Sequence, residues 1–445
     1  MNDHLFSPTY VNALGALPGT RHEWLDSLRQ SGRALFGAAG LPTRSMESWR
    51  YTSLADLASI PFSPASIGDV SEVVSVPMEV PAFSDEVLLV FVNGEFNSKM
   101  STVFEDSDFD FEFRPFNTAS ETNISWVRSR LGGLAIPSDN SIVALNSAYM
   151  AGGAVLRIGE GKHVDKIVHI VNIGHTGGEP IAWHPRFLFV LDGYSKIKVI
   201  ESHVGLPGQP YFSNQVVEIY LGPRAEMKRY IDVQEDSEAF HLATSAIELK
   251  SDSSYEEFSL VANGRKVRRE TRLNLAGERA SSVLNGAYAL EGESHCDITT
   301  FVNHSAVHTK SSQVIKGVLA GKSRGVFQGH IKVKPDAQRV EGHQLHKAIL
   351  LNRGPEVDCK PELEIYADDV KCSHGATTAE LDPEHLFYLM SRGLDPRGAR
   401  NLLTKGFLLD VVQKVIESEV QHAYQDIISR WLGSRSEAED KAAQL

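Results

Sequence analysis

Cysteine is scarce in this 445-residue sequence, which contains only three. Three thiols cannot form the disulfide framework of a small secreted domain. No apolar run approaches the roughly 20 residues of a membrane span. The first residues also lack the basic segment and following apolar segment of a signal peptide. We therefore expect a cytoplasmic protein with no membrane-spanning segment.

An excess of basic residues is also missing. The 57 aspartates and glutamates outnumber the 44 lysines and arginines, which gives a formal net charge of −13. A general nucleic-acid binder, or a protein that binds anionic membranes, needs a basic surface. The charge balance therefore argues against both. Hydrophobic residues make up 42% of the chain, the proportion of an ordinary globular protein.

The common nucleotide-binding motifs are absent as well. Gly317, Gly321, Lys322 and Ser323 resemble a phosphate-binding P-loop, but only three residues separate the two glycines, where the motif needs four. The loop length determines how the backbone N–H groups surround a phosphate. No Gly-x-Gly-x-x-Gly opens a βαβ unit either. We therefore expect that this chain binds no ATP itself.

Three regions differ in pattern. Residues 1–150 are mixed and partly helical, with apolar residues at near-helical spacing from Thr20 to about Gly37. Residues 87–92 predict a strand, and Asn93-Gly94 after them is a hairpin-turn signal. Residues 151–380 contain many short β-rich runs, and residues 381–445 are helical.

The β-rich runs of residues 151–380 are separated by polar or glycine-containing corners, with few two-residue hairpin turns. No long helix interrupts the later part, so alternating βαβ units are not expected. Stacked short strands over this length fit a β-solenoid, in which each coil covers its neighbour. A β-sandwich or jelly roll fits the same pattern, and the spacing alone leaves both open.

The last region shows two helix starts, Asp382-Pro383 and Asp395-Pro396, each an N-cap followed by proline at the first helical position. Apolar residues recur after them at helical spacing, from Leu402 to Trp431. The stripe serves either to pack these helices on the β-rich core or to bind a partner protein. The pattern alone favours packing.

Potential metal ligands are concentrated in one window. All three cysteines and seven of the 17 histidines lie between residues 295 and 374, and thiolate and imidazole are ligands for iron, zinc and copper. No Cys-x-x-Cys is present, so a self-sufficient cluster site is not expected. In a strand, Cys372 and His374 would point to the same face. They could supply half of a metal site, or His374 could activate the Cys372 thiol.

Acidic residues near this pair offer a different reading. Glu362, Glu364 and Asp368 could act as general acid and base. Some β-helix proteins are carbohydrate lyases or hydrolases, and this chain could be one of them, although that argument is an analogy between folds.

Several longer segments resemble the SufB/SufD family of iron–sulfur cluster assembly subunits, and its SufD branch more than its SufB branch. The segments are residues 362–377, 386–393 and 321–329, together with residues 40–43, Glu47, Trp49, Tyr51 and Thr52 near the start. Ala379, Cys359 and His330 depart from the family's pattern, so no role is inherited by the last two.

The resemblance implies a mainly β fold, with a right-handed parallel β-helix core flanked by a helical N-terminal region and a helical C-terminal domain. It implies a scaffold subunit without catalytic residues, which pairs with a SufB-like protein or with a second copy of itself when alone. A SufC-like ABC ATPase would dock on the C-terminal domain and would bind the ATP. A transient iron–sulfur cluster would form at the SufB interface, and a reduced flavin has been proposed for the complex.

The same resemblance suggests functional residues. His374, and with less weight Cys372, would lie at the cluster-assembly site shared with SufB. Docking of SufC would involve Leu402, Leu403, Phe407 and Val411.

Overall fold

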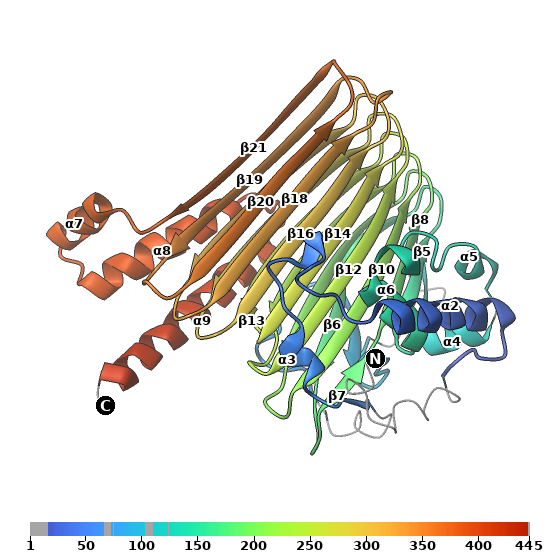
Figure 1. The fold of residues 1–445 in the computed structure, drawn as a ribbon, viewed down its shortest axis with the longest axis horizontal. Coiled ribbons are helices and arrows are strands. Elements are labelled where there is room, and N and C mark those ends of the chain that lie inside the picture. The colour runs from blue at the N-terminus through green and yellow to red at the C-terminus, as the bar shows by residue number, and fades with distance from the viewer. Residues whose placement is uncertain (1–16, 66–72, 74, 103–109, 123, 444–445) are drawn as a thin grey trace.

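The structure, a computed structural model, describes residues 17–65, 73, 75–102, 110–122 and 124–443. The first residues, on which the expectation about a signal peptide rests, lie outside these ranges. The centre of the protein is a parallel β-solenoid of about eight turns (Figure 1). The predicted β-helix flanked by helices is thus confirmed, and the sandwich and the jelly roll are excluded.

Two sheets face each other across the solenoid, and each coil gives one strand to each sheet. The first sheet contains β4 (Phe111–Pro115), β5 (Gly153–Ile158), β8 (Arg186–Leu191), β10 (Tyr211–Leu221), β12 (Ala239–Leu249), β14 (Lys266–Leu275), β16 (His295–His304), β18 (Arg324–Val333) and β20 (Glu356–Ile365), with β1 (Ser63–Pro64) and β7 (Ile181–Trp183) beside them. The second sheet contains β2 (Glu86–Val92), β3 (Glu95–Phe96), β6 (His163–Gly174), β9 (Lys196–Gly205), β11 (Glu226–Gln234), β13 (Ser254–Asn263), β15 (Ser281–Leu290), β17 (Lys310–Leu319), β19 (Val340–Leu350) and β21 (Val370–Ala379).

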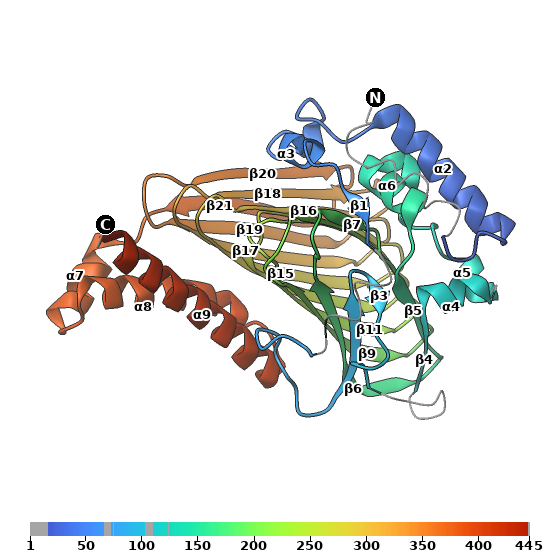
Figure 2. The same ribbon diagram turned by 90° about the horizontal axis from the view of Figure 1, so that it is seen from below.

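Helices lie outside both sheets (Figure 2). Those of the N-terminal region are α2 (Glu23–Ala39), α3 (Ala55–Ala58), α4 (Phe116–Glu121), α5 (Ser125–Arg128) and α6 (Ser141–Tyr149), with the 3₁₀ turns η2 (Glu47–Trp49) and η4 (Pro137–Asp139). Those at the C-terminus are α7 (Pro383–Ser391), α8 (Pro396–Val412) and α9 (Ser418–Ala443). No helix among the described residues is long and apolar enough to cross a membrane.

The solenoid begins before residue 151. Strand β2 pairs in parallel with β6, and β4 pairs in antiparallel with β5, so the N-terminal region supplies strands to both sheets. Strand β2 also turns back on β3 through Asn93 and Gly94, whose φ angles are 51° and 82°. Such positive values are what a two-residue hairpin turn needs, and the predicted turn is confirmed.

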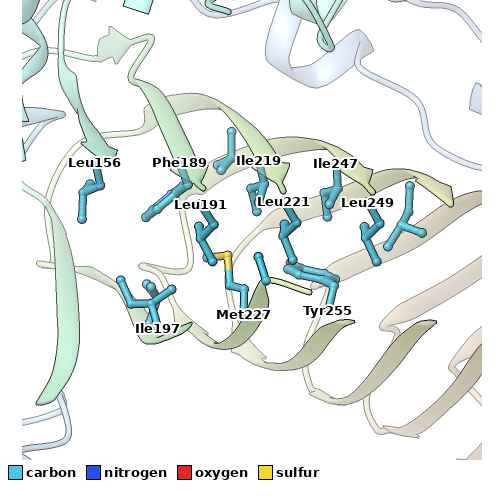
Figure 3. Close-up of a cluster of buried hydrophobic side chains, with 14 of the residues drawn as sticks. Leu156, Phe189, Leu191, Ile197, Ile219, Leu221, Met227, Ile247, Leu249 and Tyr255 are labelled. Carbon is cyan, nitrogen blue, oxygen red and sulfur yellow. The ribbon is translucent and has the colours of Figure 1, made fainter. Parts of the chain in front are cut away.

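Stacked apolar side chains fill one part of the interior (Figure 3). Leu156, Phe189, Ile219 and Ile247 occupy matching positions on successive strands of the first sheet. All four are buried. Because each coil repeats the register of the one before, an apolar residue at this position covers its equivalent in the next coil.

The C-terminal helices pack on the outer face of the second sheet. Helices α8 and α9 contact β13, β15 and β17, and Val411, Ile427 and Trp431 bury their side chains there in one apolar cluster with Phe258. Asp382 and Asp395 accept hydrogen bonds from backbone N–H groups in the first turns of α7 and α8. The predicted caps are thus confirmed, and packing explains much of the apolar stripe.

The segment that resembles a P-loop runs from the end of β17 through a turn into β18. A Cβ atom on Gly317 would lie 2.0 Å from the ring of Tyr288, so the strand can pass this ring only without a side chain. Gly321 has a φ of 69° in the turn. Both glycines therefore have structural roles in the stacking of the coils.

We expect the substitution Gly317→Ala to destabilise the protein, because the added methyl group overlaps the Tyr288 ring in a closely packed interior. Overpacking of this kind costs about 1–3 kcal/mol. Denaturant unfolding measures the change. Gly406→Ala is the matched control, because its added methyl group meets no atom within 4 Å on the helix α8, where alanine is favoured over glycine. Equal stability of both variants would contradict the packing argument.

Candidate functional site

The solenoid is open at its C-terminal end. Strand β20 pairs with β18 and strand β21 with β19, and each is the last strand of its sheet. Within the described residues, no strand covers their other edges. An exposed strand edge presents unpaired N–H and C=O groups, which are available for pairing with another chain.

Cys372 and His374 both lie on the side of β21 that faces the solenoid interior. The thiol of Cys372 packs against the interior apolar cluster, and its Sγ lies 3.4 Å from the position of a Cβ on Gly342. His374 shares this side because side chains alternate along a strand, and it pairs with Gln344, which is buried. The imidazole is exposed because no further coil lies above it. The sequence prediction that the two residues share one face is consistent with this arrangement.

Cys359, to which the sequence analysis assigned no role, lies in the same terminal coil. The rings of Phe327 and His346 stack across the interior with centroids 5.2 Å apart. One coil further, Cys359 occupies the position of Phe327, and Ala376 that of His346. Cys359 packs against the interior cluster that contains Phe327. The sequence alone could not predict that Cys359 lies in this coil's interior. Which residues of two strands face each other depends on the conformation of the corner that joins the strands.

Burial keeps these thiols protonated. It raises the pKa of Cys359 to about 11 and also raises the pKa of Cys372, which a hydrogen bond with the Gly342 backbone opposes only in part. Thiolate is the form that binds metal ions and attacks electrophiles. The open end of this chain alone therefore offers two protonated thiols and an exposed imidazole, which is an incomplete metal site.

Most other histidines of the enriched window have structural partners. His304 bonds through its two ring nitrogens with Thr309 and Ser311, and Nε2 of His346 lies 2.9 Å from the Tyr288 hydroxyl. His295 contacts Thr52, His330 lies beside Glu364, and His343 bonds with Ser373. The concentration of histidines thus reflects mainly the packing of the solenoid and only in part the site at its end.

Two of the three acidic residues singled out in the sequence are paired with cations. Glu362 lies 3.1 Å from the Lys360 ammonium, and Glu364 lies 2.8 Å from that of Lys332. The hydrogen bond from Lys332 lowers the pKa of Glu364. A general acid needs a raised pKa, so this geometry does not favour the alternative of a carbohydrate-active enzyme.

The predicted partner-binding residues of α8 differ in exposure. Leu402 is 50% exposed, Leu403 and Phe407 are half-buried, and Val411 is 0% exposed within the cluster that joins α8 to the second sheet. Val411 therefore packs α8 against the second sheet and has no exposed surface that a partner could contact. Helix α7 has no buried residue and exposes large apolar side chains, namely Phe387, Tyr388 and Met390.

The N-terminal segment that carries the first part of the family resemblance lies across the first sheet. The Arg268 guanidinium lies 4.1 Å from the centre of the Trp49 ring, and Thr52 bonds with His295 and Asp297. Glu47 reaches Lys360 of the terminal strand β20 at 2.7 Å. These residues brace the outside of the solenoid as far as its open end.

Comparisons with known proteins agree with this architecture. A family described as the SufBD core domain of the SUF system for FeS cluster assembly matches residues 173–407, and the SufBD N-terminal region matches residues 6–170. The chain is 27% identical over 420 residues to an iron–sulfur cluster assembly SufBD family protein of Synechocystis, with 92% of each chain covered. It is 28% identical over 401 residues to SufD of Escherichia coli, with 89% of each covered, and 23% identical over 416 residues to SufD of Bacillus subtilis, with 92% and 94% covered.

We expect Cys359 to react slowly with iodoacetamide at pH 8, because a thiol with a pKa of about 11 is about one-thousandth ionised there. Its alkylation rate should lie about two orders of magnitude below that of a free cysteine and should rise with pH beyond pH 9. Mass spectrometry of the labelled peptides measures each rate, and the unfolded chain is the control. A rate that levels off near pH 9 in the folded chain would contradict the raised pKa.

Proposed function

Because the chain belongs to the SufBD family of iron–sulfur cluster assembly proteins, we propose that it is a non-catalytic scaffold subunit of a SufBCD-type complex. Its open solenoid end pairs with a SufB-like protein, and its C-terminal helices dock a SufC-like ATPase. The iron–sulfur cluster is the cargo of this complex and is built at the joint between the two solenoids.

The observation that carries the proposal is the open end itself. Two strands of ten residues each leave their outer edges unpaired, and the inward-facing Ile365 is 40% exposed because no coil covers it. Natural proteins protect such edges. Another solenoid end in the same register would continue both sheets and bury this apolar surface. A second copy of this chain would satisfy the same geometry, so the partner's identity is a matter for experiment.

Cluster chemistry follows from the same end. Cys372 and His374 face the space that a partner coil would close, and thiolate and imidazole are suitable ligands for iron. Iron binding displaces the proton of a thiol, which offsets the raised pKa of Cys372. The partner must supply further ligands, because one chain offers too few for a closed site.

Docking of the ATPase is supported by the exposed apolar side chains of α7 and by Leu402 on α8. Helix α7 extends away from the solenoid (Figure 1), whereas α8 packs on the second sheet through its later residues. Leu403 and Phe407 of α8 are half-buried and contribute the part of their surface that is exposed. In the proposed complex, the partner ATPase binds and hydrolyses ATP, and this chain acts as the scaffold.

Two substitutions should separate the two partners in an anaerobic pull-down with mass spectrometry. Ile365→Asp should lose the SufB-like protein and keep the ABC ATPase, because it places a charge in the joint between the solenoids. Leu402→Asp should do the reverse. Ile136→Asp is the matched control, because this isoleucine is 45% exposed and precedes η4 in the N-terminal region. Recovery of the wild-type chain alone, or of a self-dimer only, would overturn the proposed complex.

We expect His374→Ala to lower the yield of clusters on the reconstituted complex by about tenfold, in the range seen when metal sites lose a supporting group. Iron and acid-labile sulfide per complex measure this yield. His343→Ala is the control, because His343 is also exposed and lies on the neighbouring strand β19. Unfolding curves should match for both variants. Wild-type cluster yield in His374→Ala would remove His374 from the site.

A further inference from the structure

A second group of possible metal ligands is buried at a corner of the solenoid. His203 on β9, His241 on β12 and Glu235, in the turn between β11 and β12, bring their ligand atoms within 4.8 Å of one another. All three side chains are at most 3% exposed. The two imidazole rings lie edge to face with centroids 4.6 Å apart. This group is on early coils, whereas Cys372 and His374 are on the last one.

Two nitrogen atoms of this group have no hydrogen-bond partner. Nε2 of His203 and Nε2 of His241 are both buried and unpartnered, and the nearest carboxylate oxygen to His203 Nε2, on Glu201, is 3.7 Å away. That distance is too long for a hydrogen bond. Leaving a buried polar atom unpaired costs about 1–3 kcal/mol, so two such atoms side by side indicate a missing partner.

The carboxylate of Glu235 also lacks a fixed positive charge. It accepts hydrogen bonds from the Tyr211 hydroxyl at 2.6 Å and from His241 Nδ1 at 3.0 Å. Among the described residues, no lysine or arginine forms an ion pair with it. The neighbouring Glu201, by contrast, is held by both ends of the Arg229 guanidinium at 2.7 and 2.9 Å. Buried charges are usually paired or coordinate a metal ion. Of the two glutamates, Glu201 already has a cation beside it, and Glu235 is the one whose charge an added cation would balance.

We infer that His203, His241 and Glu235 hold one divalent first-row transition-metal ion, of the series from iron to zinc. Two imidazoles and one carboxylate are a ligand set suited to these metals.

The group lies close to the protein surface on its Glu235 side. Glu235 also lines a surface pocket of about 440 Å³ between the corners of the solenoid and α9, where Arg430 and Trp431 form part of the opposite wall. None of the residues labelled in Figure 3 lines this pocket. The inference is independent of the proposed scaffold function, because it uses no residue of the open end.

Titration of the full chain with Co²⁺ after treatment with a chelator tests the site. The chain should carry Cys372→Ser and His374→Ala, so that the open end contributes no ligand. We expect one Co²⁺ per chain with visible d–d absorption, and X-ray absorption with nitrogen and oxygen ligands but no sulfur. Competition with Zn²⁺ and, without oxygen, with Fe²⁺ then ranks the metals.

The variants His203→Gln, His241→Gln and Glu235→Gln should each weaken Co²⁺ binding at least tenfold. His304→Gln is the matched control and should bind as before, because His304 is equally buried but has both nitrogens bonded. Zn²⁺ should raise the melting temperature of the parent chain and of the control, and should leave that of Glu235→Gln unchanged. This comparison remains informative even if a variant is less stable than the parent chain without metal. Absence of stoichiometric binding, sulfur ligation, or unchanged affinity in the three variants would each overturn the inference.

Discussion

The in-register parallel ladder of backbone hydrogen bonds is the constraint on which this structure depends. Because successive coils repeat the same path, inward side chains on strands such as β13, β15, β17 and β19 lie directly over their equivalents. A polar residue in the interior must therefore find its partner on a neighbouring coil or across the narrow core. Arg229 does so with Glu201 on its own sheet and with Glu257, to which it is register-paired on the next coil. Such buried pairs favour one register, because a slipped coil would separate their charges.

The same constraint explains why the two ends of the solenoid differ. At the beginning, β4 and the β2–β3 hairpin close the sheets with antiparallel strands, and helices of the N-terminal region cover the outside. At the other end, β20 and β21 have neither an antiparallel strand nor a helix over their edges among the described residues. The chain thus covers the beginning of the solenoid and leaves open the end where its thiols and an imidazole lie.

Local signals in the sequence predicted the local structure well. The Asn93-Gly94 turn and the caps at Asp382 and Asp395 depend on neighbouring residues only, and the structure has all three. The shared side of Cys372 and His374 also follows from strand alternation. What the sequence could not give are contacts set by coil stacking, such as Cys359 in the same terminal coil, or His203 beside His241. The histidine-rich window drew attention to residues 295–374, although most of those rings bond within the fold, while the buried group with unpartnered nitrogens lies earlier in the chain.

The order of the coils along the chain also determines the order in which they can fold during translation. A solenoid coil needs only its predecessor as a template, and a nascent chain leaves the ribosome from its N-terminus at roughly 5–20 residues per second. The coil of β20 and β21 is therefore the last of the solenoid to emerge, and it settles on a stack that is already present. The helices that cover β13, β15 and β17 follow it. A product truncated before residue 379 lacks a complete open end, so the proposed pairing through this end would admit only chains whose translation has passed that residue.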